Sequence, residues 1–127
     1  MPFATIRVSV LFGLVWLGAG AAATAHHSPS MFDQQQKKSV SGTVREFQWS
    51  NPHCYVQLLV RNAKGVEEEW SFEMGAPTYL YGRGWRPSTL KAGDVIHISY
   101  APLRRGGNGG MLLQATRSDG KPLGKKP

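Results

Sequence analysis

The sequence predicts an all-β fold: a small five-stranded β-barrel with an OB-like order of elements and one short helix between the third and fourth strands. Three observations predict it. The apolar-alternating segments are short and separated by turn residues, the first of them reverses its apolar face, and 127 residues suffice for a single modest core. A small two-sheet β-sandwich is the alternative fold.

The first predicted strand, Ser39–Ser50, changes its apolar face partway along. Val44 has one parity, whereas Phe47 and Trp49 have the other, so the switch falls near Glu46. One extra residue in a β-bulge flips the side chains that follow it. A bulged strand can pair at both of its ends, which lets five short strands curl into a closed barrel.

The second and third predicted strands form a hairpin. His53–Val60 is strand-like, and Asn62–Gly65 supplies a turn with a glycine. Val66–Met74 then shows the clearest alternation in the chain, with Trp70 and Phe72 on the apolar side. A period of two over this length indicates a half-buried strand rather than a helix.

The second half of the chain alternates between compact turns and strands. Proline near the start and glycine near the end of one segment are typical of a short helix. The predicted elements are a helix over Ala76–Arg83, a turn over Leu90–Asp94, a strand over Val95–Ala101, a glycine-rich loop over Arg104–Gly110 and a last strand over Met111–Arg117.

The beginning of the chain has the three-part pattern of a secretory signal peptide. A short basic start precedes the apolar run Val8–Leu17, and small residues follow. We therefore expect a periplasmic or secreted protein, with an uncleaved membrane anchor as the alternative. The predicted organisation is a signal peptide over 1–25, an extended N-terminal arm over 26–38, the β-barrel over 39–120 and a flexible basic tail over 121–127.

Short motifs spread along the mature chain resemble one family. They are His26-His27-Ser28, Met31-Phe32-Asp33, Gly42-Thr43-Val44, Trp49-Ser50-Asn51-Pro52-His53, Gly84-Trp85, Leu90-Lys91-Ala92-Gly93-Asp94 and Gly109-Gly110. Together they resemble the domain of unknown function 6152 family of exported bacterial proteins. The resemblance implies a small secreted β-rich domain and no particular activity, and Cys54 and His97 lie outside its motifs.

Histidines near the expected cleavage site suggest a metal site. Cleavage after Ala25 would place His26 first, where its α-amine and ring can chelate one ion, whereas cleavage after Ala23 would place His26 third. Either nitrogen set suits copper, and His27 and His53 can complete it. Zinc is less expected because no Cys/His quartet is present. The alternative is that these histidines are ordinary solvated residues.

A second candidate site combines aromatic and basic side chains. The formal charge of +7, from 15 basic and 8 acidic residues, falls by one if Arg7 leaves with the signal peptide. Such a rim suits a non-metal ligand, an envelope glycan, an anionic surface or a protein partner, whereas export argues against specific nucleic-acid binding. Its candidate residues are Trp49, Trp85, Arg86, Arg104 and Arg105.

Catalysis has little support in the sequence. No nucleophile elbow is present, and the neighbours His53 and Cys54 point to opposite faces if both lie in a strand. Cys54 is the single cysteine, so no internal disulfide can form, and a buried strand residue is its simplest interpretation. We therefore expect a monomeric or dimeric binding protein rather than an enzyme, with a purely structural envelope protein as a further alternative.

Overall fold

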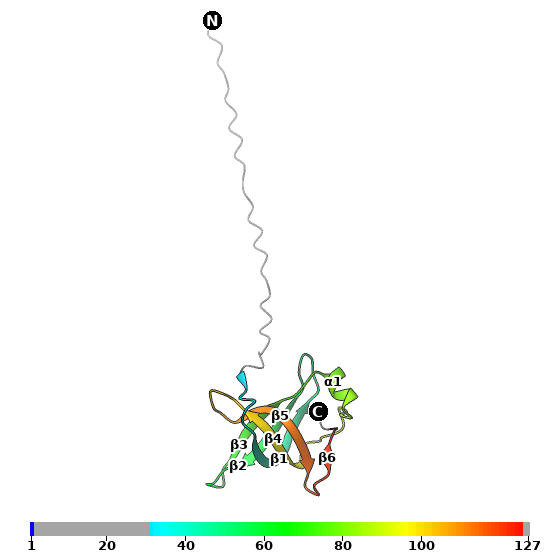
Figure 1. Ribbon diagram of the computed structural model, residues 1–127. Helices are drawn as coiled ribbons and strands as arrows, with labels where there is room; N and C mark the ends of the chain where they lie inside the picture. Colours follow the sequence, from blue (N-terminus) through cyan, green and yellow to red (C-terminus); the bar gives the residue numbers. More distant parts are fainter. Residues whose placement is uncertain (2–30, 126–127) are drawn as a thin grey trace.

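The computed structural model describes Met1 and residues 31–125 of the chain, and its main body is a curled sheet with one short helix (Figure 1). The elements, in order, are β1 (Lys38–Gln48), β2 (Tyr55–Arg61), β3 (Glu67–Glu73), α1 (Pro77–Gly82), β4 (Val95–Pro102), β5 (Gly109–Arg117) and β6 (Pro122–Leu123). Among the described residues, no helix has the length and apolar character needed to cross a membrane.

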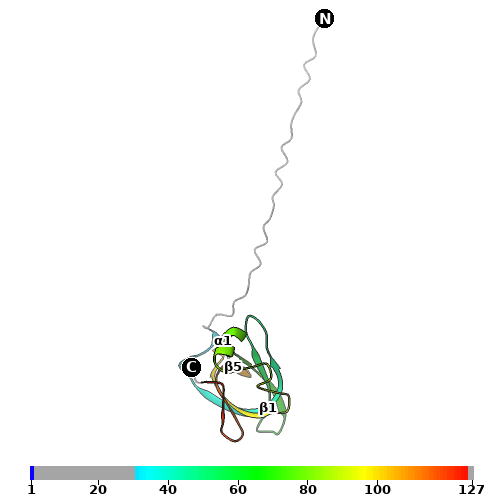
Figure 2. The ribbon, with the colours of Figure 1, turned by 90° about the vertical axis from the view of Figure 1, so that its right-hand side faces the viewer.

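The strand pairings close the sheet into a barrel. β1 pairs antiparallel with both β2 and β4, β2 pairs with β3, and β4 pairs with β5. A parallel pairing of β3 with β5 joins the two ends, as the rounded outline in Figure 2 shows. The prediction of a five-stranded OB-like barrel with a helix after β3 is therefore confirmed, and the chain does not form the alternative sandwich.

The bulge predicted in β1 is present and divides the strand between its two partners. The register against β2 shifts between Val44 and Glu46, and Thr43 pairs on one side with Leu59 and on the other with Val95. Gly42 lies at this bend, where a Cβ atom would overlap the carbonyl oxygen of Leu59. The first strand can therefore serve both halves of the barrel because it bends at a bulge beside a glycine.

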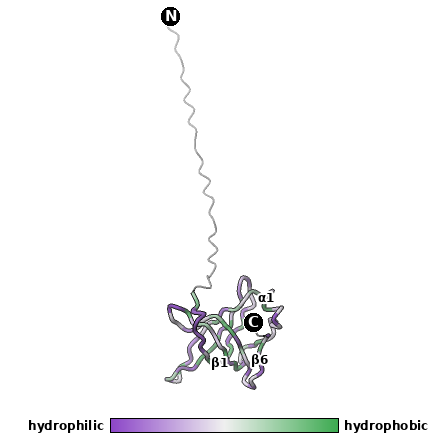
Figure 3. The backbone as a smooth tube through the Cα atoms, in the orientation of Figure 1, coloured by the Kyte–Doolittle hydropathy of each residue, from purple (hydrophilic) through white to green (hydrophobic). Residues whose placement is uncertain are grey.

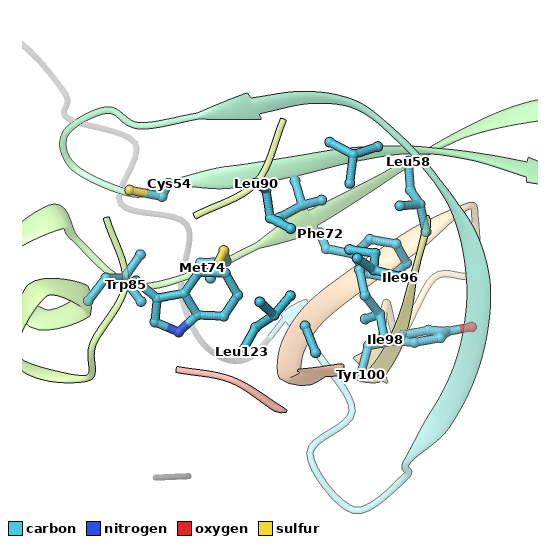
Figure 4. Packing of buried hydrophobic residues seen from close by; sticks show 14 of the residues in the cluster. Cys54, Leu58, Phe72, Met74, Trp85, Leu90, Ile96, Ile98, Tyr100 and Leu123 are labelled. Carbon is cyan, nitrogen blue, oxygen red and sulfur yellow. The ribbon is translucent and has the colours of Figure 1, made fainter. Parts of the chain in front are cut away.

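The barrel interior holds the core. Phe72 is fully buried, and its ring centroid lies 5.1 Å from that of Tyr100. The buried residues of the strands are apolar, as the alternation predicted. Figure 3 shows hydrophilic segments in the connections between the strands. Figure 4 shows Leu58, Ile96 and Ile98 near Phe72, and Met74, Trp85 and Leu123 toward the other end of the cluster.

The C-terminal segment differs from its prediction as a flexible tail. Pro122–Leu123 forms β6 on the edge of β5, and Leu123 is 9% exposed within the core cluster. The backbone N–H of Lys125 also donates to the carbonyl of Arg83 at 2.7 Å. Strand pairing, a backbone hydrogen bond and one buried apolar side chain thus hold a basic, proline-containing segment against the barrel. The predicted signal peptide beyond Met1, arm residues 26–30 and residues 126–127 lie outside the described part.

Candidate ligand-binding cleft

A cleft lies below α1 in the described part of the molecule, between the helix and strands β5 and β6. Its volume is about 580 Å³, which lies within the range of ~300–1,000 Å³ typical of small-molecule sites. Most of its wall is apolar, and the main apolar residues are Phe32, Met74, Leu80, Met111, Leu113 and Leu123. The polar groups on the wall are few, as in most sites that bind small organic ligands.

α1 forms the roof of the cleft because one of its side chains is anchored in the core. Pro77 occupies the first turn, where the missing N–H costs no hydrogen bond, and Ala76 precedes it without a side-chain cap. Leu80 is 3% exposed, and its carbonyl oxygen accepts a hydrogen bond from the N–H of Trp85 at 3.0 Å. The exposed Tyr79 also contributes to the cleft wall. The helix is therefore short but fixed.

One histidine–carboxylate pair lies in the wall of the cleft. Nδ1 of His53 lies 2.7 Å from Oε1 of Glu73, whose side chain is only 12% exposed. The hydroxyl of Tyr55 donates to the other carboxylate oxygen at 3.4 Å. With the Nδ1 proton shared with Glu73, Nε2 is the ring nitrogen left to meet a ligand. This pair is the main polar feature that can orient a ligand in the cleft.

The ladder between β2 and β3 explains the position of this pair. The N–H of Cys54 donates to the carbonyl of Gly75 at 3.0 Å, and the N–H of Met74 donates to the carbonyl of Cys54 at 2.8 Å. The hydroxyl of Ser50 donates a hydrogen bond to the carbonyl oxygen of His53 at 2.9 Å. His53, two residues before β2, and Glu73, the last residue of β3, are thereby brought together at one end of the barrel.

Two neighbouring groups have raised pKa values. Burial raises the pKa of the Tyr55 hydroxyl, and the negative charge of Glu73 and the hydrogen bond to it act in the same direction. Burial likewise raises the pKa of the Cys54 thiol, against a smaller opposing effect of its contact with the carbonyl of Ser50. Cys54 is therefore a buried neutral thiol in the core, which fits a packing role better than metal ligation.

The residues of the predicted metal site fall in different places. His53 lies in the cleft wall, while His26 and His27 lie outside the described residues. His97 is on the outer surface of β4, where Nδ1 lies 2.9 Å from the Ser41 hydroxyl. Within residues 31–125, no three His, Cys, Asp or Glu side chains are grouped as metal ligands would be. The described part therefore offers His53 with Glu73, and any further ligands would have to come from elsewhere.

The predicted aromatic and basic rim is divided by the fold. Trp49 packs edge-on against Tyr81 with ring centroids 5.4 Å apart, and the Arg86 guanidinium lies over the same ring at 4.6 Å. Trp85, in contrast, is 4% exposed, packs against the core and lines the cleft below α1, so it lies in the cleft wall and not on this surface. The sequence predicts this tryptophan at the surface because it lies between a glycine and an arginine, and neither neighbour indicates that the side chain is buried.

The two other rim arginines lie away from the helix. Arg104 and Arg105 belong to the loop between β4 and β5, on the opposite side of the barrel from α1 (Figure 1). There they line a second hollow with Met31 and Leu103. The five predicted rim residues therefore do not form one continuous surface, and Trp49 with Arg86 is the part that the fold brings together.

Several cleft residues were not predicted from the sequence. Glu73 belongs to the outward-facing positions of the alternating strand, which usually meet solvent. Leu123 and Lys125 belong to the predicted tail, and the sequence predicts Met111 and Leu113 only as residues of the last strand. The sequence nonetheless contains a signal for Glu73. In an antiparallel hairpin the last residues of the second strand lie beside the first residues of the first strand, which places Glu73 near His53.

Comparison with protein families confirms the resemblance noted in the motifs. A model described as "Family of unknown function (DUF6152)" matches residues 15–114, which is most of the chain. A search of curated proteins finds no match.

Solved structures with a similar shape include the mitochondrial single-stranded DNA-binding protein Rim1 of S. cerevisiae. It is 9% identical with a TM-score of 0.49, and the match covers 71% of this chain and 95% of that one. The dimeric N-terminal domain of PriB from Thermoanaerobacter tencongensis is 12% identical with a TM-score of 0.49, covering 66% of this chain and 97% of that one. At these values neither likeness bears on function.

Proposed function

We propose that this chain, which belongs to the DUF6152 family, is an exported binding protein that holds a small ligand in the cleft below α1. The observation that carries the proposal is the combination of an apolar hollow of about 580 Å³ with the His53–Glu73 pair in its wall. An apolar hollow supplies the binding energy, and one fixed polar pair supplies orientation. The leader pattern supports export to the periplasm or beyond.

The aromatic surface around Tyr81 supports binding less well. The Arg86 guanidinium already donates to the carbonyls of Tyr81 and Trp85, at 3.1 and 2.7 Å. The guanidinium therefore stabilises the backbone at the end of α1, and a ligand would have to compete with these two hydrogen bonds. Trp85 is buried, and it belongs to the cleft wall rather than to this surface. The cleft is therefore the better candidate, and it defines the proposed function as binding rather than turnover.

A larger side chain that fills the cleft is expected to weaken binding of a neutral apolar dye. Leu113 is a half-buried wall residue on β5, so Leu113→Trp would fill the space that the dye needs. We expect Nile red fluorescence to rise on addition of the mature wild-type protein and the affinity of Leu113→Trp to fall at least about tenfold. The measurement is a fluorescence titration.

The control for this experiment is Val66→Trp. Val66 is 56% exposed and lies outside the cleft, in the turn before β3. The Val66→Trp variant should bind the dye with the affinity of the wild type and have an unchanged melting temperature. Equal dye affinity of Leu113→Trp and the wild type, both folded by circular dichroism, would remove the cleft as the binding site.

Copper is a second candidate ligand, and the contact between His53 and Glu73 favours it. Imidazole ligands of metals commonly donate their second ring N–H to a carboxylate, which fixes the ring and raises its basicity. Phe32 lines the same cleft as His53. Phe32 lies five positions after His27, so the chain between their Cα atoms can span at most ~18 Å. We therefore propose that His26 and His27 of the mature N-terminus bind copper together with His53.

Micromolar Cu(II) is expected to stabilise the mature protein, because a ligand that binds only the folded state adds about 2.7 kcal/mol at a hundredfold excess over its Kd. His26→Ala and His53→Ala should each lose most of this shift in melting temperature. His97→Ala is the matched control, since its ring contacts Ser41 on the outer surface. Mass spectrometry first establishes that His26 or Thr24 is the N-terminal residue. An unchanged melting temperature and visible spectrum would contradict copper binding.

The two candidates separate in one cross-test. Leu113→Trp should abolish dye binding and leave the copper-induced shift intact, because Leu113 has no metal-ligating atom. His26→Ala should have the opposite effect.

A further inference from the structure

We infer that the thioether sulfur of Met111 is a ligand of the copper site in the cleft, and that this site takes Cu(I), the softer oxidation state of the metal. The inference rests on the copper binding proposed above, since it adds a ligand to the site of His53. Three features carry it: the position of Met111 beside the His53–Glu73 pair, the ligand chemistry of sulfur, and the apolar surroundings.

Strand pairing places Met111 next to the His53–Glu73 pair. In the parallel contact between β3 and β5, Met111 is the register partner of Glu73. Neighbouring strands lie about 4.8 Å apart, and register partners direct their side chains to the same face of the sheet. Glu73 contacts Nδ1 of His53 at 2.7 Å, and all three residues line the cleft. Nε2 of His53 and the sulfur of Met111 therefore belong to the same part of the cleft wall.

The backbone of Met111 is fixed on both sides by strand pairing. Met111 pairs with Ala101 of β4 as well as with β3. The two glycines before it allow this close packing, because a Cβ at Gly109 would overlap the carbonyl oxygen of Ser71 and a Cβ at Gly110 would overlap that of Ala101. An unbranched, partly exposed side chain thus projects from a rigid position, which is the arrangement that a metal ligand needs.

A thioether distinguishes the two oxidation states of copper. Imidazole nitrogen suits copper in general, whereas the soft sulfur of methionine selects Cu(I). Two other sulfur atoms lie nearby but are less suited. Cys54 is 0% exposed in the core. Met74 also lines the cleft, but it follows Glu73 directly, so the two side chains point to opposite faces, and Figure 4 shows Met74 within the buried cluster.

The apolar surroundings favour the ion of lower charge. Phe32 and Leu113 line the same cleft as Met111. Moving a charge from water to apolar surroundings costs free energy, and the cost is smaller for a singly charged ion than for a doubly charged one. Phe32 is also the cleft residue that follows His26 and His27 in the sequence. The proposed site therefore combines imidazole nitrogen with one thioether sulfur.

The test measures the affinity of the mature protein for Ag(I) and for Cu(II) by isothermal calorimetry. Ag(I) is a soft ion of the same charge as Cu(I) and is stable in air. Met111→Leu is expected to lower the affinity for Ag(I) at least about tenfold and to leave that for Cu(II) within about twofold, because leucine keeps the size of the side chain without its sulfur. Competition with bathocuproine disulfonate in the presence of ascorbate repeats the comparison for Cu(I) itself.

Met74→Leu is the matched control, since it makes the same change in the same cleft and should keep both affinities. His53→Ala should weaken binding of both ions. Nile red binding shows that the cleft is intact, and Met111→Leu should bind the dye with the affinity of the wild type. In methyl NMR, Ag(I) should shift the methyl resonance of Met111 and leave that of Met31, which lines the second hollow, in place.

The outcomes separate this inference from the proposed function. Equal Ag(I) and Cu(I) affinities of Met111→Leu and the wild type would overturn the thioether ligand, while Cu(II) binding that depends on His53 would leave the histidine site standing. A loss of Ag(I) affinity in Met74→Leu in place of Met111→Leu would contradict the assignment of Met111. No binding of Ag(I), Cu(I) or Cu(II) by the wild type would overturn both the inference and the proposed copper binding.

Discussion

Gly109→Ala is expected to lower the free energy of unfolding by about 3 kcal/mol, because it acts where the barrel closes. Gly109 begins β5 and pairs with Ser71 of β3 in the parallel contact that joins the two ends of the sheet. Its φ of 148° is one that side-chain-bearing residues rarely adopt. A Cβ atom at this position would also overlap the carbonyl oxygen of Ser71. Neither obstacle can be relieved without moving β3 away from β5.

Urea denaturation followed by circular dichroism measures the loss. Gly82→Ala is the matched control, since a Cβ at Gly82 meets nothing within 4 Å and its φ is not positive. The control should change the free energy of unfolding by no more than about 0.5 kcal/mol. A Gly109→Ala protein as stable as the control would show that the contact between β3 and β5 does not close the barrel in solution.

Phe72→Ala is expected to cost about 3–5 kcal/mol, the usual range for removing a fully buried aromatic side chain. Phe72 is 0% exposed, and its ring centroid lies 6.2 Å from that of Trp70 and 5.1 Å from that of Tyr100, so the three rings form one cluster. Truncation removes its buried apolar area and leaves a cavity beside the rings of Trp70 and Tyr100. For a domain of this size the melting temperature should fall by more than 10 °C, since ~1 kcal/mol shifts it by about 4–8 °C.

Differential scanning calorimetry of Phe72→Ala beside Val95→Ala tests this expectation. Val95 also lies on a strand but is 55% exposed, so its truncation should change the melting temperature only slightly. Similar losses in the two variants would mean that Phe72 is not the centre of the core. Because Phe72 does not line the cleft, dye binding measured well below the melting temperature should persist in this variant.

The fold was largely predictable because its strands carry strong local signals. The reversal of apolar parity near Glu46 predicted the bulge, and the alternation through Phe72 predicted β3 with its inward face. The parallel contact of β3 with Gly109 was not predictable from any local pattern, since it joins segments far apart in the chain. The burial of Leu123 was also not predictable. A strand of two residues is too short to show an alternating pattern, and its basic and proline neighbours are typical of an exposed tail.

The site was predictable only in part. His53 was selected as a ligand because it follows a turn at a strand start, and the structure places it in the cleft wall. Its partner Glu73 was not selected, because an outward strand position next to solvent is the usual place for a glutamate. The rim prediction grouped residues by type, and the fold separated Trp49 and Arg86 from Arg104 and Arg105. Composition alone cannot say which residues share a face.

The cleft itself is tested most directly by methyl NMR of the mature protein, with the neutral apolar dye Nile red added. Binding in the cleft predicts shifted methyl resonances for Met111, Leu113 and Leu123, while those of Val66 and Val95 stay in place. Shifts confined to residues around Tyr81, or no shifts at all, would contradict the assignment of the cleft as the binding site.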